Sequence, residues 1–95
     1  METERFVAFE WDEAKRSANI EKHGIDFFAA SAALLRPHAE IRSDRNGEVR
    51  LLAVCPAASG LITVIYTMRG ESCRIISARA AHINEQRTYR QIFGG

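Results

Sequence analysis

One stretch near the C-terminus, Arg74-Ile75-Ile76-Ser77-Ala78-Arg79, organises the chain. It begins as an apolar strand and ends in a polar, cationic tip. The residues that follow predict a helix over 80–93. A strand that leads an arginine directly into a helix can place several polar groups around one spot. The helix carries Glu85, Arg87, Tyr89 and Arg90, and we expect the spot where it meets the strand to bind a phosphate group.

The chain before this stretch has the pattern of strands joined by short turns. Asn46-Gly47 is a strong hairpin signal, because both residues tolerate the left-handed backbone of a tight turn. Two further loops are expected at 56–60 and 69–72. Because the loops are short, we expect an antiparallel meander of four strands, over residues 38–43, 48–55, 61–68 and 73–78.

The N-terminal third predicts one strand followed by two helices. Residues 6–11, including Val7, alternate between two largely apolar faces and favour a buried strand. Asp12 and Asp26 are expected N-caps, because their carboxylates can accept from the free amides of a new helix. Gly24 suits the left-handed position that ends a helix. We therefore expect helices over 13–22 and 27–35.

Together these elements predict an α+β fold in a single domain, residues 1–95. The expected order is β-α-α-β-β-β-β-α, with an antiparallel sheet and the helices packed on it. The closing helix is expected to pack on the sheet through Ile83, Tyr89, Ile92 and Phe93.

The composition excludes several classes of protein. The chain has 95 residues, of which 46% are hydrophobic, enough for one packed core. No apolar run approaches the roughly 20 residues of a membrane span, and Met1–Arg5 lack the apolar run of a signal peptide. We therefore expect a cytoplasmic protein without membrane contact. Cys55 and Cys73 show no metal-ligand spacing, so no metal site or cofactor is expected.

The charged residues are unevenly distributed. Residues 1–35 have a net charge of −3 and residues 36–95 a net charge of +4, and eleven of the 13 basic residues are arginine. Arginine grips phosphate with two parallel hydrogen bonds. A genome rich in G and C also favours arginine codons, so composition alone does not assign a ligand.

Several segments form a specific combination when they are taken together. They are Phe9-Glu10-Trp11-Asp12-Glu13-Ala14-Lys15, Asn19, Lys22-His23-Gly24, Glu48-Val49-Arg50, Tyr66-Thr67-Met68-Arg69, Arg74 to Ala80, Glu85 and Tyr89. This combination resembles the BrnT family, the toxin half of a bacterial type II toxin–antitoxin pair.

The resemblance implies a RelE-like fold and a metal-independent ribonuclease that needs no cofactor and blocks translation. It also implies a BrnA-type antitoxin as the inhibiting partner. Two antitoxins would join two toxins in a heterotetramer, and promoter DNA would be contacted only through the antitoxin.

Metal-free RNA cleavage needs a base, an acid and a group that stabilises the pentacoordinate phosphate. Arg69 and Arg79 are the candidates for the stabilising group, since a guanidinium is permanently cationic. Arg69 lies in an expected turn and Arg79 follows a strand end. Adjacent antiparallel strands place these two positions at opposite ends of one ladder unless a strand bends. Arg79 has an alternative structural role, a salt bridge to Glu85 or to an acidic residue of the first helix.

Three residues are candidates for proton transfer. His23 has an ordinary pKa near neutrality, but a histidine at a helix end is also a common cap. Glu85 is a candidate base, and Tyr89 lies one helical turn later. The alternative for this pair is a surface hydrogen bond at four-residue spacing, and the ring of Tyr89 can also simply cover the core.

Five further residues are candidates for RNA binding: Lys15, Lys22, Arg50, Arg74 and Trp11. Trp11 can stack on a base, or it can anchor the first strand to a helix. Exposed helix lysines often have no specific partner, and Arg74 is equally well explained by an ion pair.

Three hypotheses of function follow. The first is a ribonuclease toxin that arrests growth. The second is an inert member of the fold that serves only as a co-repressor with its antitoxin. The third is a generic α+β protein that binds another anion. A neighbouring reading frame for a small acidic antitoxin separates the third from the first two, and an expression assay separates the first from the second.

Overall fold

The structure, a computed structural model, describes residue 6 and residues 8–94. The predictions made from the sequence for Met1–Arg5, Val7 and Gly95 lie outside the described residues. The chain forms three helices and one five-stranded sheet in the part described. Along the sequence the elements are β1 (Ala8–Glu10), α1 (Glu13–His23), α2 (Phe27–Leu34), β2 (Ala39–Arg42), β3 (Leu51–Ala57), β4 (Gly60–Arg69), β5 (Ser72–Ala80) and α3 (Ile83–Phe93).

The sheet has the strand order β1-β5-β4-β3-β2. The four strands from β2 to β5 pair antiparallel as expected. The prediction of an entirely antiparallel sheet is wrong at β1, which pairs parallel with β5 through Phe9 opposite Cys73. No hairpin turn sets the direction of β1, because two helices separate it from the other strands.

The turns explain where the strands begin and end. Asn46 and Gly47 both have positive φ, 52° and 80°, as the hairpin signal predicted. The loop expected at 56–60 is only a turn at 58–59, because Pro56 belongs to β3 and pairs with Leu61. β2 pairs only with residues 51–54. Beyond that point no strand of the described residues pairs with β3 on its outer side, so a proline without an N–H is tolerated there.

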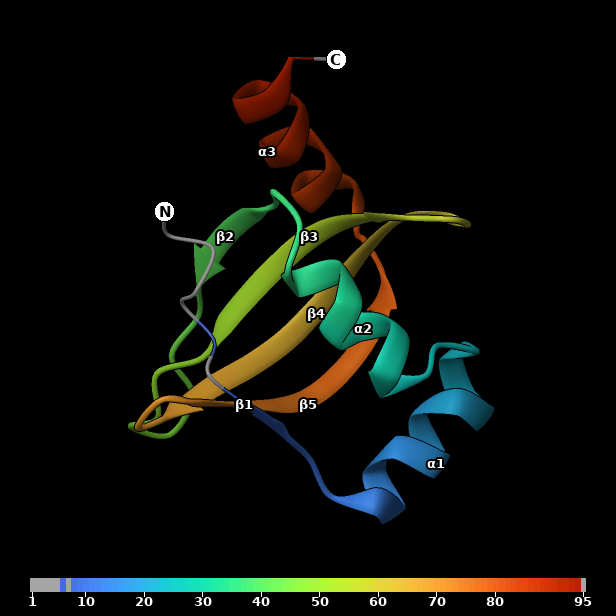
Figure 1. Cartoon of the computed structure of the whole chain (residues 1–95). Helices are drawn as coiled ribbons and strands as arrows, with labels where there is room; N and C mark the ends of the chain where they lie inside the picture. The colour runs from blue at the N-terminus through green and yellow to red at the C-terminus, as the bar shows by residue number, and fades with distance from the viewer. Residues whose placement is uncertain (1–5, 7, 95) are drawn as a thin grey trace.

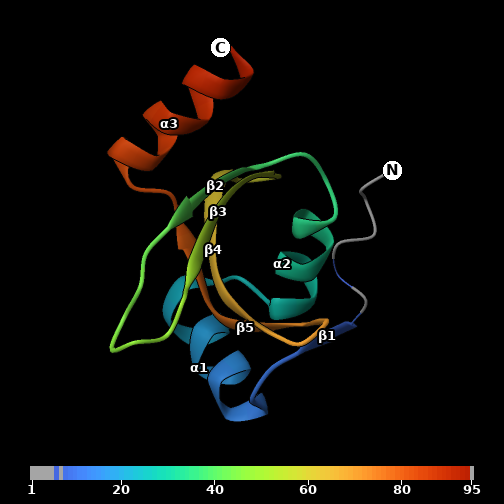
Figure 2. The ribbon, with the colours of Figure 1, turned by 90° about the vertical axis from the view of Figure 1, so that its left-hand side faces the viewer.

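One face of the sheet carries the main core. The curved sheet wraps around α2 (Figure 2), whose Phe27 is fully buried. The strands contribute Val64, Tyr66 and Ile75 to the same cluster. Burial of such side chains is the main favourable term in folding. On the opposite side of the sheet, α3 contacts β2 and β3 (Figure 2), and the rest of that face carries no helix of the described residues; we call it the open face.

The first helix docks on the edge of β5 through one buried amide. Asn19 is 6% exposed. Its side chain accepts from the N–H of Ala78 (3.1 Å) and donates to the carbonyl of Ala78 (2.9 Å). The same amide donates to the carbonyl of Ile25 at 2.9 Å. Because β1 ends before this point, Asn19 takes the place of a neighbouring strand.

The expected helix caps are confirmed. The Asp12 carboxylate accepts from the N–H groups of Ala14 and Lys15, and the Asp26 carboxylate accepts from the N–H of Phe28. Gly24 ends α1 with φ 72°. Arg16 joins the two helices with a two-point ion pair to Asp26, at 2.8 and 3.0 Å.

The third helix projects away from the sheet (Figure 1). Tyr89 packs against Ala39, Val54 and Ala81, but Ile83, Ile92 and Phe93 are 59%, 58% and 44% exposed. The predicted packing of these three residues is therefore wrong. Ile83 and Ile92 lie nine positions apart, on opposite sides of a helix, so they cannot share one buried face. None of the helices in the described residues is long and apolar enough to cross a membrane.

Replacing Asn19 with alanine should lower the free energy of unfolding by about 3 kcal/mol, because buried N–H and C=O groups of β5 lose their partner. The measurement is urea unfolding followed by circular dichroism. Ser17→Ala, on the exposed side of the same helix, should change the free energy by no more than about 0.5 kcal/mol. Equal effects of the two substitutions would show that the Asn19 contacts do not hold α1 on the sheet.

Candidate functional site

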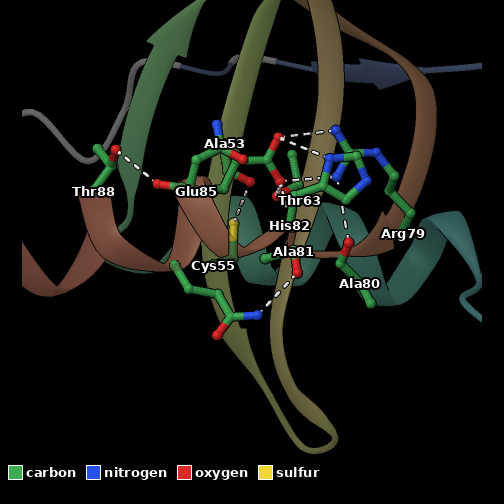
Figure 3. Close-up of polar contacts among 11 residues, drawn as sticks. Ala53, Cys55, Thr63, Arg79, Ala80, Ala81, His82, Glu85 and Thr88 are labelled. Atoms are coloured by element: carbon green, nitrogen blue, oxygen red, sulfur yellow. Dashed lines mark hydrogen bonds and ion pairs between the residues drawn. The ribbon is translucent and has the colours of Figure 1, made fainter.

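The end of β5 and the first turn of α3 meet at one buried carboxylate, that of Glu85 (Figure 3). The Arg79 guanidinium donates Nη1 to Oε1 at 2.8 Å and Nη2 to Oε2 at 2.9 Å. The Thr63 hydroxyl donates to Oε1 at 2.7 Å, and the backbone N–H of His82 donates to the same oxygen at 2.8 Å. Thr63 is the cross-strand neighbour of Arg79. We call these four residues the Glu85 cluster.

The cluster keeps Glu85 ionised. Its side chain is only 4% exposed. The hydrogen-bonded Arg79 guanidinium, with the His82 N–H and the Thr63 hydroxyl, lowers the pKa of Glu85 to about 2 against the opposing effect of burial. A carboxylate with so low a pKa is a weak proton acceptor. The geometry favours Glu85 as a residue that positions Arg79.

Beside the cluster, the open face of the sheet contains a hollow of about 270 Å³. Its floor is a cross-strand row of Leu52, Ile65 and Ser77. Arg79 lines the hollow and also belongs to the Glu85 cluster, so it joins the two. The complete lining is Ser43, Arg45, Arg50, Leu52, Ile65, Ile76, Ser77 and Arg79.

Two irregularities of the sheet shape this hollow. β4 and β5 lose register between Ile65 and Tyr66, which leaves Ile76 as an extra residue in β5. Such a bulge bends its strand and redirects side chains. The hairpin between β2 and β3, residues 43–50, leaves the sheet on the side opposite α2 (Figure 2). The hollow lies where this hairpin meets the open face.

The three arginines around the hollow differ in their partners. Arg79 is paired with Glu85, and Arg50 donates Nε to Glu48 at 3.0 Å. Arg45 is exposed, and its guanidinium makes no hydrogen bond or ion pair with the described residues. The three arginines and two carboxylates therefore leave a net charge of +1 at the rim.

The structure does not bring Arg69 or Arg74 to the hollow. Arg69 pairs with Ser72 in the ladder and Arg79 pairs with Thr63. Thr63 and Arg69 lie six positions apart along β4, a distance of about 20 Å at the usual rise of a strand. Arg74 lies toward the same far end and donates Nη1 to Glu10 at 3.2 Å. The structure therefore places Arg69 and Arg79 at opposite ends of the β4–β5 ladder, as the antiparallel pairing predicted.

The candidates on α1 also lie outside the lining. Lys15, Lys22 and His23 are exposed on this helix. Trp11 is partly buried, and it contacts Phe27 and Phe28 edge-on, with ring centroids 5.9 and 4.8 Å away. These contacts fit the alternative role for Trp11, an anchor between β1 and the helices.

Tyr89 is close to the cluster in sequence but has a packing role. It stacks on Phe93 with ring centroids 4.6 Å apart, and it covers the small cluster around Val54. This agrees with the alternative expectation that the ring covers the core. Its place one turn after Glu85 keeps it a candidate for proton transfer.

Sequence reasoning missed several residues of the site. Ser43, Arg45 and Ser77 line the hollow, and Thr63 supports Glu85. The only local signal was the Asn-Gly turn. It predicts a hairpin that carries Arg45, but it does not predict the side of the sheet to which the hairpin leans. Among the described residues, no three His, Cys, Asp or Glu side chains gather as a metal site requires.

These features define a small α+β protein with a cationic hollow on the open face of its sheet. Residues 11–85 match the family model described as the ribonuclease toxin BrnT of type II toxin–antitoxin systems. The chain belongs to this family of ribonuclease toxins, and an antitoxin is therefore its partner. The matched segment contains Arg79 and Glu85 but ends before Tyr89. No curated protein matches the chain.

The Glu85 cluster predicts a pH dependence of stability. The pKa of Glu85 falls from an ordinary 4.5 to about 2 in the folded protein. The folded state therefore gains stability that is complete above pH 4.5 and is lost as the pH falls toward 2, about 3 kcal/mol in all. Glu85→Gln should lower the urea midpoint at pH 7, and its deficit should shrink at pH 2.5.

The matched control is Glu71→Gln, in the exposed turn between β4 and β5. This variant should keep the pH profile of the unsubstituted protein. A deficit of Glu85→Gln that is the same at both pH values would show that the charge of Glu85 does not stabilise the fold.

Proposed function

We propose that the chain cleaves RNA at the hollow without a metal ion and that Arg79 stabilises the reacting phosphate. The observation that carries this proposal is the open edge of Arg79. Within the described part of the chain, its hydrogen bonds use Nη1 and Nη2, to Glu85 and to the carbonyl of Ala80, and none uses Nε. The edge formed by Nε and Nη2 is thus left for two parallel bonds to a phosphate.

The reaction would be an attack of the ribose 2′-oxygen on the adjacent phosphorus. Charge builds on the non-bridging oxygens, where a preorganised guanidinium stabilises it most. Glu85 holds Arg79 in place, since a two-point ion pair fixes the plane of the guanidinium. The bond between phosphorus and the 5′-oxygen breaks as the new bond forms; a base takes the proton of the 2′-hydroxyl, and an acid gives a proton to the leaving 5′-oxygen.

Histidine is the side chain best suited to transfer protons near neutral pH. His82 already belongs to the Glu85 cluster through its backbone N–H, and its side chain, which is 63% exposed, places Nδ1 4.0 Å from Oε2 of Glu85. His82 is therefore the first candidate for proton transfer, with Tyr89 as the second. His23 and Arg69 stay sequence-based predictions, because neither lines the hollow.

The partner that controls the site would be a BrnA-type antitoxin. A segment of it that covers the hollow would exclude RNA from the same arginines. Two antitoxins would join two toxins in a heterotetramer, and promoter DNA would be bound through the antitoxin. The fold that supports this arrangement would be of the RelE-like class.

A second candidate function is an inert co-repressor that binds its antitoxin without cleaving RNA. The observation that favours it is the pairing of Arg50 and Arg79 with carboxylates, which reduces the charge available to a substrate. Expression of the chain alone separates the two functions, because only the ribonuclease arrests growth.

Arg79→Ala should abolish growth arrest and slow RNA cleavage by about 100-fold or more, as loss of one transition-state donor does elsewhere. Cleavage of a labelled RNA by the purified protein measures the rate. Arg87→Ala, on the exposed side of α3, is the control and should cleave at the unsubstituted rate. Full activity in Arg79→Ala would remove Arg79 from the mechanism.

Cleavage should persist in excess EDTA, because attack by the 2′-oxygen needs no metal-bound water. The products should carry a 2′,3′-cyclic phosphate, since that oxygen replaces the 5′-oxygen on phosphorus. Mass spectrometry of the products identifies the new end. Loss of activity in EDTA with recovery on adding Mg²⁺ would contradict the proposal.

A further inference from the structure

Arg45 stands apart from the other arginines of the hollow. It lies at the start of the tight turn, where its backbone N–H and carbonyl both pair with Glu48 at 2.9 Å. These bonds fix the backbone and leave the exposed guanidinium without a partner among the described residues. Its neighbour Arg42 is different, because Asp44 accepts its Nε and Nη2 at 2.9 and 3.0 Å.

The charge at the rim explains why this difference matters. Glu48 offsets Arg50 and Glu85 offsets Arg79, so Arg45 supplies the unbalanced charge. A phosphate that reaches the hollow would displace no carboxylate to bind Arg45. A phosphate on Arg50 would compete with Glu48. Arg45 is therefore the first cation available to an incoming anion.

The size and chemistry of the hollow limit what can enter it. Its volume of about 270 Å³ is small for a ligand site, below the usual range for drug-sized molecules. Leu52, Ile65 and Ile76 offer apolar surface, and Ser43 and Ser77 offer hydroxyl groups. One base or ribose with its phosphate matches this lining. A duplex does not, because its bases are paired and stacked inside.

We propose that the hollow is a subsite for one unstacked nucleotide of single-stranded RNA and that Arg45 binds the phosphate of this nucleotide. The proposal rests on the ribonuclease function above and adds the substrate class and a binding residue. The apolar floor takes the base or ribose, while the hairpin holds Arg45 over the opening. Arg79 acts on the scissile phosphate next to it.

The test is binding of a fluorescein-labelled 12-nucleotide RNA that carries 2′-fluoro groups, which block cleavage. Fluorescence anisotropy gives Kd at several salt concentrations. Arg45→Ala should weaken binding about 10-fold and reduce the slope of log K against log[salt] by about 0.7, the value for one phosphate contact on a single strand. Arg45→Lys should recover part of the affinity, because a lysine restores the charge.

Arg42→Ala is the matched control, since it removes the arginine at the end of β2, next to the hairpin, which does not line the hollow. It should bind as the unsubstituted protein does. The same RNA annealed to its complement should bind at least about 10-fold more weakly. Unchanged melting temperatures of the variants show that the hairpin still folds.

Different results overturn different steps. Equal affinity and salt slope in Arg45→Ala and the unsubstituted protein would remove Arg45 from the site. Equal binding of duplex and single strand would overturn the single-nucleotide subsite while leaving RNA cleavage intact. If the unsubstituted protein neither binds nor cleaves any RNA, the ribonuclease function itself fails, and this inference fails with it.

Discussion

The buried carboxylate of Glu85 is the contact on which the rest of the site depends. It joins three elements, because its donors come from β4, from β5 and from the start of α3. Removing a carboxylate from water costs several kcal/mol, and only a full set of donors offsets this cost. Glu85 has four hydrogen bonds from such donors. α3 makes few other contacts with the sheet, so the same carboxylate anchors the helix and orients Arg79.

The curved sheet separates the main core from the hollow. Its inner face is filled by α2 and by apolar side chains such as Tyr66 and Val64, which are fully buried. The outer face is therefore not needed for the main core and can carry serines and arginines. The bulge at Ile76 lies between the two roles, because it bends a core strand and shapes the hollow on the other face.

Much of the fold follows from local signals. Asp12, Asp26, Gly24 and Asn46-Gly47 each act within a few residues, and each predicted its cap or turn correctly. Three other features depend on which distant strands are neighbours. They are the direction of β1, the inclusion of Pro56 in β3 and the exposure of α3. Periodicity within one segment contains no information on such neighbours.

The residues of the candidate site also differ in whether local sequence or distant contacts bring them together. Arg79 and Glu85 lie six positions apart at a strand–helix junction. The sequence therefore predicts that they lie close together and allows an ion pair between them, which the structure has. Ser43 and Arg45 reach the hollow only because the hairpin leans toward the open face, which no local pattern encodes. The lone histidine in a basic segment, His23, was a signal of composition, and α1 places it outside the lining.

The pairing of two rim arginines with carboxylates has a consequence for selectivity. An unpaired ring of cations binds any polyanion, because phosphate contacts dominate affinity and carry no sequence information. Glu48 and Glu85 remove most of that general attraction. What remains is the guanidinium of Arg45, unpaired within the described residues, the oriented guanidinium of Arg79 and a small apolar floor. A ligand that contacts all three binds better than one that contacts only a cation. A partly neutralised site is therefore better suited to selecting an exposed nucleotide than to holding nucleic acid of every kind.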